Sequence, residues 1–276
     1  MRIGILVEKR YLAQSQPAGL ISALTAAGHE TVCMDPQASA YSMEDHSWTE
    51  NLDLIVARGR SYHLLCLLGW AEAHGVRTIN KRSAIASVHN KADMAVILAG
   101  ARIPTPRTFL GSVQELSKLI TPSLYPIILK PVFGDNSQGL RLVHAREELD
   151  LVKWAEPVAL AQRFIPNDGR DLKLYCIGDE VWAVRKPSPF DPAADGGVKR
   201  TAAKVEHIPL TKELKDLGLR LGRLFGLELY GVDCIESPEG PAVIEVNEFP
   251  NYTGVPDADR RLAGHVSGGL KKRGKL

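Results

Sequence analysis

Two carboxylates and an amide near the C-terminus have the types and spacing of a divalent-cation site. Asp233 lies in an apolar segment typical of a strand, and Glu245 and Asn247 lie two residues apart in the strand expected to follow it. Residues two apart on a strand face the same side, and a hairpin can bring Asp233 beside them. Hard oxygen ligands of this kind suit a magnesium ion that carries phosphates. A polar outer sheet face is the alternative, but the apolar neighbours of Asp233 indicate burial, and buried like charges need a cation.

A lysine followed by a glycine-containing loop forms a second candidate site. Lys130 lies in the run 126–131, which ends an expected strand, and the loop 133–139 follows it. A lysine held at a strand end can pair with ATP phosphates while the backbone amides of the loop close over them. An ordinary hairpin is the alternative for this loop. Lys91, taken alone, has the sequence context of a solvated lysine at the start of a helix.

Two groups of basic residues indicate an anionic substrate. Lys173 lies in one expected strand and Arg185 and Lys186 end the next, so antiparallel pairing would place these cations together, facing the metal site. There they could stabilise charge on a phosphoryl group in transfer and act as catalytic residues. The second group lies at the ends of two N-terminal strands and is assigned to substrate binding: Lys9, Arg10, Arg58 and Arg60. Solvated basic surfaces are the alternative in both cases.

Residues 1–90 alternate between apolar strands and helices. Strands are expected at 2–7, 30–34, 53–57 and 77–79, and helices at 17–27 and 62–74. This alternation predicts a parallel sheet with helices on its faces, and ligands of such sheets collect at the carboxyl ends of the strands. We therefore expect an N-terminal α/β domain, residues 1–90, on the substrate side.

The rest of the chain is predicted to form two further segments. Up to residue 154 we expect helices from Lys91, at 113–120 and ending at Trp154, and strands at 108–110, 126–132 and 140–143. Beyond it we expect strands at 159–164, 172–177, 181–185, 231–236 and 242–246, and a helix at 211–225 with Thr211 as its N-cap. The basic tail 267–276 is expected to fray. We predict a central domain, 91–160, and a C-terminal α+β domain, 161–276, that contains the metal site.

Composition excludes several classes of protein. The 276 residues include 34 basic and 32 acidic ones, so a net charge of +2 creates no overall field for nucleic acid or a membrane. No apolar run approaches the ~20 residues of a membrane-spanning helix, and no signal peptide is expected. Four cysteines without CxxC spacing predict neither a zinc site nor a disulfide framework. We expect a cytoplasmic protein.

The order of motifs along the chain resembles that of the ATP-grasp superfamily. It runs through Asn90-Lys91, Pro104-Thr105-Pro106, Leu129-Lys130-Pro131, the glycine loop, Ala161 to Ile165, a hairpin, Gly231-Val232-Asp233 and Glu245-Val246-Asn247. The resemblance covers essentially the whole chain, and as a set these motifs are specific. It implies α/β and α+β parts, that is, an ATP-grasp fold preceded by a Rossmann-like (pre-ATP-grasp) parallel-sheet domain.

The resemblance also implies ATP and Mg²⁺ (or Mn²⁺) as cofactors and assigns residues to them. Those expected at the nucleotide are Lys91, Lys130, Asn136, Ser137, Gln162, Arg163, Phe164, Ile165 and Asp171. The two lysines match those that contact the α- and β-phosphates, and 162–165 matches the hinge whose backbone recognises adenine. Asp233, Glu245 and Asn247 match the metal ligands, in agreement with the spacing argument.

Two branches of the superfamily fit this chain. The RimK/LysX amino-acid ligases join a carboxylate to an amine through an acyl-phosphate, and the layout of 53–60 and 75–80 is similar to theirs. The inositol tris/tetrakisphosphate kinases phosphorylate a hydroxyl of an anionic substrate, and 247–255 is more similar to that group. Lys173 stands where the ligases carry an arginine, whereas 134–139 lacks the histidine of the kinases. We favour an ATP-dependent carboxylate–amine ligase, with the kinase second and a non-catalytic ATP-binding module third.

The expected partner is an anionic or carboxylate-bearing small molecule, and an amino acid is one candidate. A homo-oligomer is compatible with the sequence. Neither nucleic acid nor a membrane is expected as a partner.

Overall fold

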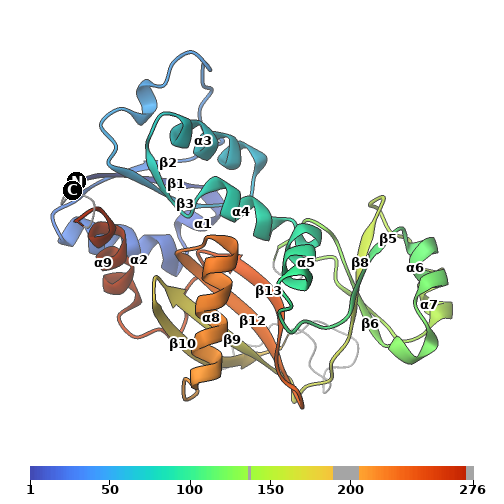
Figure 1. Ribbon diagram of the computed structural model, residues 1–276. Coiled ribbons are helices and arrows are strands. Elements are labelled where there is room, and N and C mark those ends of the chain that lie inside the picture. The colour runs from blue at the N-terminus through green and yellow to red at the C-terminus, as the bar shows by residue number, and fades with distance from the viewer. Residues whose placement is uncertain (136–137, 189–204, 272–276) are drawn as a thin grey trace.

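Three sheets, each with its own helices, make up the chain. Figure 1 shows the computed structural model, which describes residues 1–135, 138–188 and 205–271. In chain order we call the sheets the N-terminal sheet (β1–β4), the central sheet (β5–β8) and the C-terminal sheet (β9–β13). The central sheet lies at one end of the molecule, to the right in Figure 1, and the C-terminal sheet lies between it and the N-terminal sheet.

The N-terminal sheet is parallel, with strand order β2-β1-β3-β4. It contains β1 (Arg2–Val7), β2 (Glu30–Met34), β3 (Leu54–Arg58) and β4 (Arg77–Ile79), with α1 (Lys9–Leu12), α2 (Ser15–Ala26), α3 (Tyr62–Ala73) and the 3-10 helix η1 (Ser47–Thr49). Alternate residues of β1 face opposite sides, as in any strand. Ile5 belongs to the core that contains Leu24 of α2, whereas Leu6 belongs to the core that contains Leu68 of α3. Helices therefore cover both faces, as the strand–helix alternation predicted.

The central sheet is antiparallel, with order β5-β8-β6-β7. Its elements are β5 (Thr108–Gly111), β6 (Ile127–Lys130), β7 (Arg141–Val143), β8 (Ala159–Arg163), α6 (Val113–Leu119), the 3-10 helix η2 (Pro122–Leu124) and α7 (Arg146–Asp150). Leu116 of α6 and Leu149 of α7 are buried in one core with Ile127 and Leu129 of β6. This small core positions Lys130 at the end of its strand.

The C-terminal sheet is antiparallel, with order β11-β10-β9-β12-β13. Its strands are β9 (Arg170–Ile177), β10 (Glu180–Pro187), β11 (Glu206–His207), β12 (Leu229–Ser237) and β13 (Gly240–Glu248). The helices that share cores with it are α4 (Arg82–His89), α5 (Lys91–Gly100), α8 (Lys212–Phe225) and α9 (Ala258–Lys271). Leu262 of α9 packs in a core with Leu24 of α2, so the N-terminal and C-terminal sheets share hydrophobic packing.

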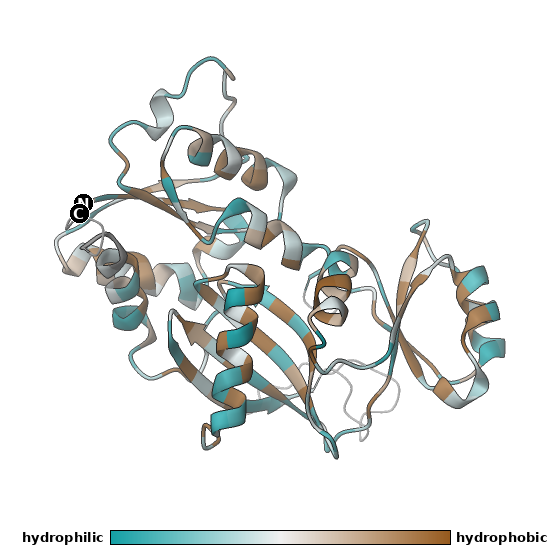
Figure 2. Cartoon of the chain, in the orientation of Figure 1, coloured by the Kyte–Doolittle hydropathy of each residue, from teal (hydrophilic) through white to brown (hydrophobic). Residues whose placement is uncertain are grey.

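Helix α8 packs against this sheet through small residues. Gly218 and Gly222 are buried on its inner face, and the Tyr230 hydroxyl of β12 donates a hydrogen bond to the Gly218 carbonyl at 2.8 Å. A Cβ atom at position 222 would collide with the Tyr230 ring and hydroxyl, so glycine permits the close approach. Figure 2 shows α8 alternating between hydrophobic and hydrophilic residues, as expected for a helix with one buried face.

Most expected elements are present, with some differences in their ends. The side chain of Thr211 accepts a hydrogen bond from the Leu214 amide at 3.2 Å, which confirms it as the N-cap of α8. Helix α7 ends at Asp150 rather than at Trp154. Helices α4 and α9 were not expected, and the fraying expected from residue 267 is wrong up to Lys271, because α9 includes these residues.

None of the helices in the described ranges has both the length and the apolar composition needed to cross a bilayer.

We predict that Asn80 is a main stabilising contact between the N-terminal and C-terminal sheets. It is buried, its side-chain amide donates to the Leu229 carbonyl at 2.7 Å, and its oxygen accepts from the Glu228 and Leu229 amides at 2.7 and 3.0 Å. Asn80→Ala removes the side-chain acceptor of the Glu228 and Leu229 amides, whereas the Leu229 carbonyl still accepts from the Phe249 amide at 2.9 Å. The substitution should lower the free energy of unfolding by about 3 kcal/mol in urea denaturation. Gln37→Ala, at an exposed position, is the control; an equal loss in both variants would contradict the prediction.

Candidate active site

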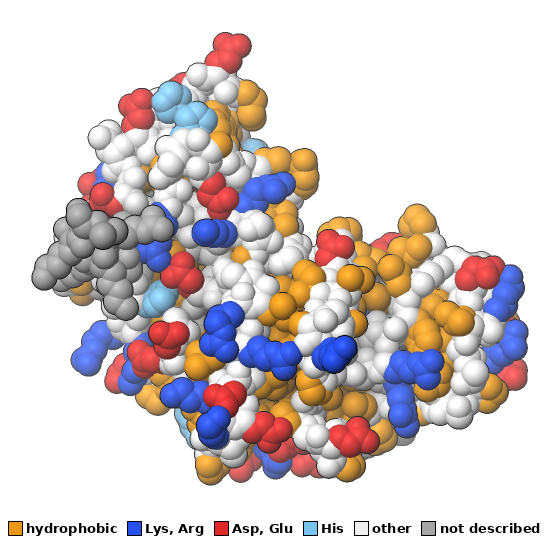
Figure 3. Space-filling view, in the orientation of Figure 1, with side chains coloured by type: hydrophobic (Ala, Val, Ile, Leu, Met, Phe, Trp, Pro, Cys, Tyr) orange, Lys and Arg blue, Asp and Glu red, His pale blue; other side chains and the backbone are white. Residues whose placement is uncertain are grey.

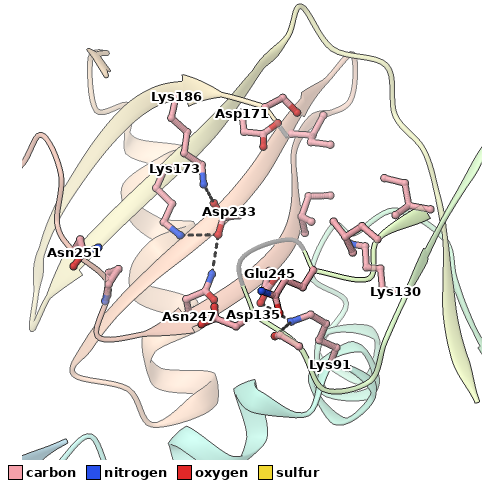
Figure 4. A pocket seen from close by; sticks show the side chains of 18 of the residues that line it. Lys91, Lys130, Asp135, Asp171, Lys173, Lys186, Asp233, Glu245, Asn247 and Asn251 are labelled. Carbon is pink, nitrogen blue, oxygen red and sulfur yellow. Dashed lines mark hydrogen bonds and ion pairs between the residues drawn. The ribbon is translucent and has the colours of Figure 1, made fainter. Parts of the chain in front are cut away.

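A cavity of about 630 Å³ lies between the central and C-terminal sheets and is closed on one side by the end of β3. Its described lining contains more cations than acids: Arg58, Arg60, Lys91, Lys130, Arg163, Lys173 and Lys186 against Asp135, Asp171, Asp233, Glu245 and Glu248. Figure 4 shows Lys173, Lys186, Lys91 and the acids that they contact pointing toward one another across this space. The charge imbalance suits an anionic ligand.

The three side chains expected to bind a metal share one face of the C-terminal sheet. Asp233 of β12 pairs directly with Glu245 of β13, and Gly231 pairs with Asn247, so the strand register places all three side by side. Asn247 donates its amide N–H to Asp233 Oδ2 at 2.7 Å. Strand alternation predicted that these three side chains lie together, and the register of β12 and β13 agrees with that prediction.

Cations of the chain itself contact every one of these three groups. Lys173 Nζ lies 2.6 Å from Asp233 Oδ2, and Lys186 contacts the other carboxylate oxygen. Lys91 Nζ lies 2.8 Å from Glu245 Oε1. Arg60 Nη2 donates to Asn247 Oδ1 at 2.9 Å. Each of the three side chains that would face a metal is thus already in contact with a cation.

The donor set fits a hard divalent cation that arrives with phosphates. Two carboxylates and an amide supply only oxygen ligands, which suits Mg²⁺ or Mn²⁺. Within the described residues no group of three or more His, Cys, Asp or Glu could hold a metal by itself. A cation at Asp233, Glu245 and Asn247 would therefore need further oxygens, and phosphate groups of a nucleotide can supply them.

Burial and neighbouring charges shift the pKa values of these groups in different directions. Burial alone would raise the pKa of Asp233, but Lys173 and Lys186 lower it well below its usual range. Burial lowers the pKa of Lys173 despite the attraction of Asp233. Lys130 is 8% exposed, and burial lowers its pKa to about 8 although Glu245 acts in the opposite direction.

Of the two lysines expected at the phosphates, only Lys91 contacts the start of the glycine loop, together with Arg60, which was expected at the substrate. Lys91 Nζ and Arg60 Nη1 each donate to the Gly134 carbonyl, both at 3.1 Å. Lys130 Nζ donates to the side-chain oxygen of Gln162. Asn136 and Ser137 lie outside the described residues.

The expected hinge also lines the cavity, with Gln162, Arg163, Phe164 and Ile165. Gln162 lies in β8, and its side-chain amide donates to Thr108 Oγ1 at 3.0 Å. Asp171 of β9 pairs with Lys186 of β10 in the sheet register, and burial raises its pKa although hydrogen bonds and Lys186 oppose this. All five of these predicted residues are therefore at the cavity.

Three of the predicted residues are not brought to the cavity, namely Lys9, Arg10 and Arg185. Helix α1 begins at Lys9, directly after β1, and the Arg10 side chain turns toward the Glu8 carboxylate at 2.9 Å. Arg185 lies between two inward-facing positions of β10 and points to the opposite face of the sheet, where it pairs with Glu236. Neighbouring strand residues face opposite sides, so Lys186 is at the site and Arg185 is not.

Sequence reasoning missed two residues that shape the site: Tyr11, which lines the cavity, and Glu8, which lies outside its lining. Tyr11 donates its hydroxyl to Asp135 Oδ2 at 2.7 Å and so joins α1 to the glycine loop. The buried Glu8 carboxylate accepts from the backbone amides of Arg60 and Ser61, both at 2.6 Å, and fixes the turn that carries Arg60. The position of Glu8 at the carboxyl end of β1 was the available signal, because ligand-binding residues collect there.

Sequence comparison places the chain among known proteins. Residues 88–264 match the model of the RimK-like ATP-grasp domain. A probable alpha-L-glutamate ligase of Maridesulfovibrio salexigens is 27% identical over 291 residues, which cover 99% of this chain and 96% of that protein. The alpha-aminoadipate–LysW ligase LysX of Sulfurisphaera tokodaii is 27% identical over 229 residues, 77% of this chain and 78% of that protein.

Solved structures give the same fold. A RimK domain ATP-grasp protein from Sphaerobacter thermophilus has a TM-score of 0.78 at 21% identity, covering 97% of this chain and 98% of that one. The ATP-grasp ligase PsnB, solved with a minimal precursor, Mg and ADP, has a TM-score of 0.70 at 19% identity, with 98% of each chain covered. The ATP-grasp fold expected from the motif order is therefore confirmed.

We predict that Asp233 stabilises the ligand-free fold as a counter-ion. Asp233→Asn leaves the buried Lys173 without its carboxylate and should lower the free energy of unfolding by about 3 kcal/mol in chemical denaturation. Glu236→Gln, on the opposite face of β12, removes only the more exposed pair with Arg185 and should cost below about 1 kcal/mol. Equal effects of the two substitutions would show that the buried pair has no special role.

Proposed function

The chain belongs to the RimK-like ATP-grasp family, and from this premise we propose that it is an ATP- and magnesium-dependent ligase that joins a carboxylate to an amine. The observation that carries the proposal is the convergence of Asp233, Glu245 and Asn247 with Lys91, Lys173 and Lys186 in one cavity. The relatives that match this chain over nearly its whole length are named as ligases. ATP-grasp ligases use ATP and Mg²⁺, and PsnB was solved with ADP and Mg.

The proposed reaction has two steps. An oxygen of the substrate carboxylate attacks the γ-phosphorus of ATP, ADP leaves, and an acyl-phosphate forms. The amine then attacks the acyl carbon, phosphate leaves, and the amine proton goes to solvent or to the released phosphate. A carboxylate nucleophile needs no deprotonation, so the first step requires positioning and charge stabilisation rather than a general base.

The cations of the C-terminal sheet are proposed to stabilise the transferring group. Lys173 and Lys186 both contact Asp233, so their charges lie beside the expected position of the γ-phosphoryl group. Asp233, Glu245 and Asn247 would hold Mg²⁺ or Mn²⁺, which when bound neutralises charge on the phosphate oxygens. Positioned charges of this kind supply most of the acceleration in phosphoryl transfer.

We propose that the nucleotide lies between the central and C-terminal sheets. Lys91 and Lys130 would contact the phosphates under the loop that includes Asn136 and Ser137, the backbone of 162–165 would recognise adenine, and Asp171 would contact the nucleotide. With the domains that we predict, 1–90, 91–160 and 161–276, this nucleotide site would lie between the last two. The substrate would enter from the first, beside Arg58 and Arg60, which line the cavity.

The kinase alternative is not favoured, because the matched relatives are named as ligases of glutamate and of alpha-aminoadipate. The same names argue against a module that only binds ATP. They also support an amino acid or a carboxylate-bearing molecule as the substrate. A cytoplasmic location and a homo-oligomer stay predictions from the sequence.

Product analysis tests the proposal directly. The protein is incubated with ATP, Mg²⁺ and a metabolite pool, and products are identified by mass. A product that has gained an amino-acid residue, with one ADP released per bond, is expected. A gain of one phosphoryl group would establish the kinase instead, and the absence of both product and ADP would leave the binding module.

We predict that Lys173→Ala lowers turnover more than nucleotide affinity. Its ammonium group contacts Asp233 and would act on the γ-phosphoryl group, whereas Lys130 would contact phosphates that bind in the ground state. Lys173→Ala should reduce kcat by about 100-fold or more, while Lys130→Ala mainly raises the Kd of the nucleotide. Steady-state kinetics and calorimetry measure the two effects; wild-type turnover of Lys173→Ala with intact ATP binding would disprove the role of Lys173.

We also predict that nucleotide binding takes up a proton near pH 8. Burial lowers the pKa of Lys130 to about 8 in the free protein, and neighbouring phosphates would raise it. Because the charged form binds, affinity should be constant below pH 8 and fall as the pH rises through this value. Calorimetry in buffers of different ionisation enthalpy measures the uptake. Lys130→Gln should abolish it, and the same uptake in that variant would assign the proton to another group.

A further inference from the structure

The strand that carries two of the expected metal ligands lies at the edge of the C-terminal sheet. Glu245 and Asn247 belong to β13, which pairs with β12 on one side and with no strand of the described chain on the other. An edge strand leaves a row of amide and carbonyl groups without partners in its own sheet. Figure 1 shows α5 beside β13, and the two elements are in contact. Whatever bonds to the open side of β13 therefore also helps to fix the two ligands.

A β-bulge precedes Glu245 in this strand. Glu245 pairs with Asp233 of β12. Val243, two residues earlier, pairs with Cys234, the next residue of β12, so Ile244 is an extra residue in β13. Ile244 and Glu245 both line the cavity, although consecutive residues of a regular strand face opposite sides. Bulges of this kind redirect side chains beside active sites, and this one turns Glu245 to the cavity while Val243 stays in the core.

Two acceptors from outside the sheet bind amides on the open side of β13. The Val243 amide donates to the Pro104 carbonyl at 2.8 Å, and the Val246 amide donates to Met94 Sδ at 3.2 Å. These two amides flank the bulge, so α5 and the residues that follow it take the place of a neighbouring strand there. Of the two acceptors, the thioether sulfur is the weaker one.

Met94 lies on the buried face of α5, one turn after Lys91. It is 3% exposed and packs in the same core as Val246. Lys91 Nζ contacts the Glu245 carboxylate, so α5 holds this ligand by its side chain and the next residue by its backbone. A methionine side chain is flexible enough to follow an irregular strand, which suits an acceptor placed beside a bulge.

We propose that Met94 is a positioning residue of the metal site, whose sulfur holds the Val246 amide and thereby fixes Glu245 and Asn247. Val246 lies between the two ligands in the chain, so a shift of its amide moves both. Without the sulfur, the buried N–H would lack its acceptor, which is costly, and β13 would shift to find another. This assignment rests on the proposed ligase function, because it concerns the metal that the function requires.

The test compares two substitutions at position 94 in the whole chain. Met94→Leu keeps an apolar side chain of similar volume and removes the acceptor, whereas Met94→Gln keeps the length and supplies an oxygen acceptor. Binding of Mn²⁺ is followed by electron paramagnetic resonance at saturating β,γ-imido analogue of ATP. Met94→Leu should bind Mn²⁺ about 10-fold more weakly than the wild type, because its ligands are displaced. Met94→Gln should recover most of this loss.

Amide hydrogen exchange tests the same bond without metal or nucleotide. In the ligand-free protein, the Val246 amide should exchange about 10-fold or more faster in Met94→Leu than in the wild type. The Val243 amide, which is bonded to Pro104, should keep its wild-type rate. A general loss of packing would accelerate both amides. This comparison decides the question even if Met94→Gln fails to fold.

Leu98→Val is the matched control on the same helix. Leu98 is 2% exposed and packs in the same core as Met94, but its side chain offers no acceptor to β13. This substitution should lower the thermal midpoint of unfolding through lost packing and leave the Mn²⁺ affinity unchanged.

Four results would overturn the role of Met94: wild-type Mn²⁺ affinity in Met94→Leu, an equal loss in Leu98→Val, no recovery in a folded Met94→Gln, or an unchanged exchange rate of the Val246 amide in Met94→Leu. The ligase proposal fails separately. A wild-type protein that binds no Mn²⁺ with the ATP analogue would refute the metal site and the role of Met94 with it. Unchanged Met94 variants of a protein that does bind Mn²⁺ would refute only the role of Met94.

Discussion

The buried charge balance around Asp233 is the constraint on which the rest of the structure depends. Its carboxylate lies in a low-dielectric cavity, where an unpaired charge would be expensive, and Lys173 and Lys186 compensate it from two neighbouring strands. Glu245 has the same relation to Lys91 on α5. These contacts hold two acids and three lysines in one space, so both acids are already compensated before a ligand binds. A metal ion that binds alone would add positive charge beside the three lysines. A triphosphate that binds alone would be repelled by the two acids. A metal–nucleotide complex brings both signs of charge together, so the arrangement selects the complex over its components.

The N-terminal sheet contributes to this site through backbone geometry as much as through charge. Glu8 accepts from the amides of Arg60 and Ser61, which sets the direction of the Arg60 side chain toward Gly134 and Asn247. Tyr11 bonds to Asp135 of the glycine loop and at the same time stacks on Arg58. The substrate side and the phosphate side of the cavity are therefore physically connected. Figure 3 shows Lys and Arg side chains interspersed with Asp and Glu on the outer face seen there, so the specific electrostatics lie in the cavity and not on that surface.

The sequence was most informative where a local rule decides the geometry. Strand alternation placed Glu245 and Asn247 on one face, and the N-cap preference placed the start of α8 at Thr211. The same alternation, applied to Arg185 and Lys186, would have predicted that these two side chains face opposite sides of the sheet.

The contact of Lys91 with Glu245 joins residues far apart in the chain, so without the family resemblance this lysine had the sequence context of a solvated residue. The hydrogen bond from the Val246 amide to Met94 Sδ exists only once α5 has packed against β13, and no pattern in the sequence indicates it. Helix α9 was missed for a similar reason, because Leu262 and Val266 acquire their burial from α2.

Binding of Mn²⁺, followed by electron paramagnetic resonance with and without ATP, tests the central claim most directly. Because only two of the three expected metal ligands are acids and both are paired with lysines, the free protein should bind Mn²⁺ weakly, and ATP should strengthen this binding by about 100-fold or more through reciprocal linkage. The same experiment should show that ATP binds weakly without the metal. Tight Mn²⁺ binding in the absence of nucleotide, or ATP binding that is indifferent to Mn²⁺, would contradict the account.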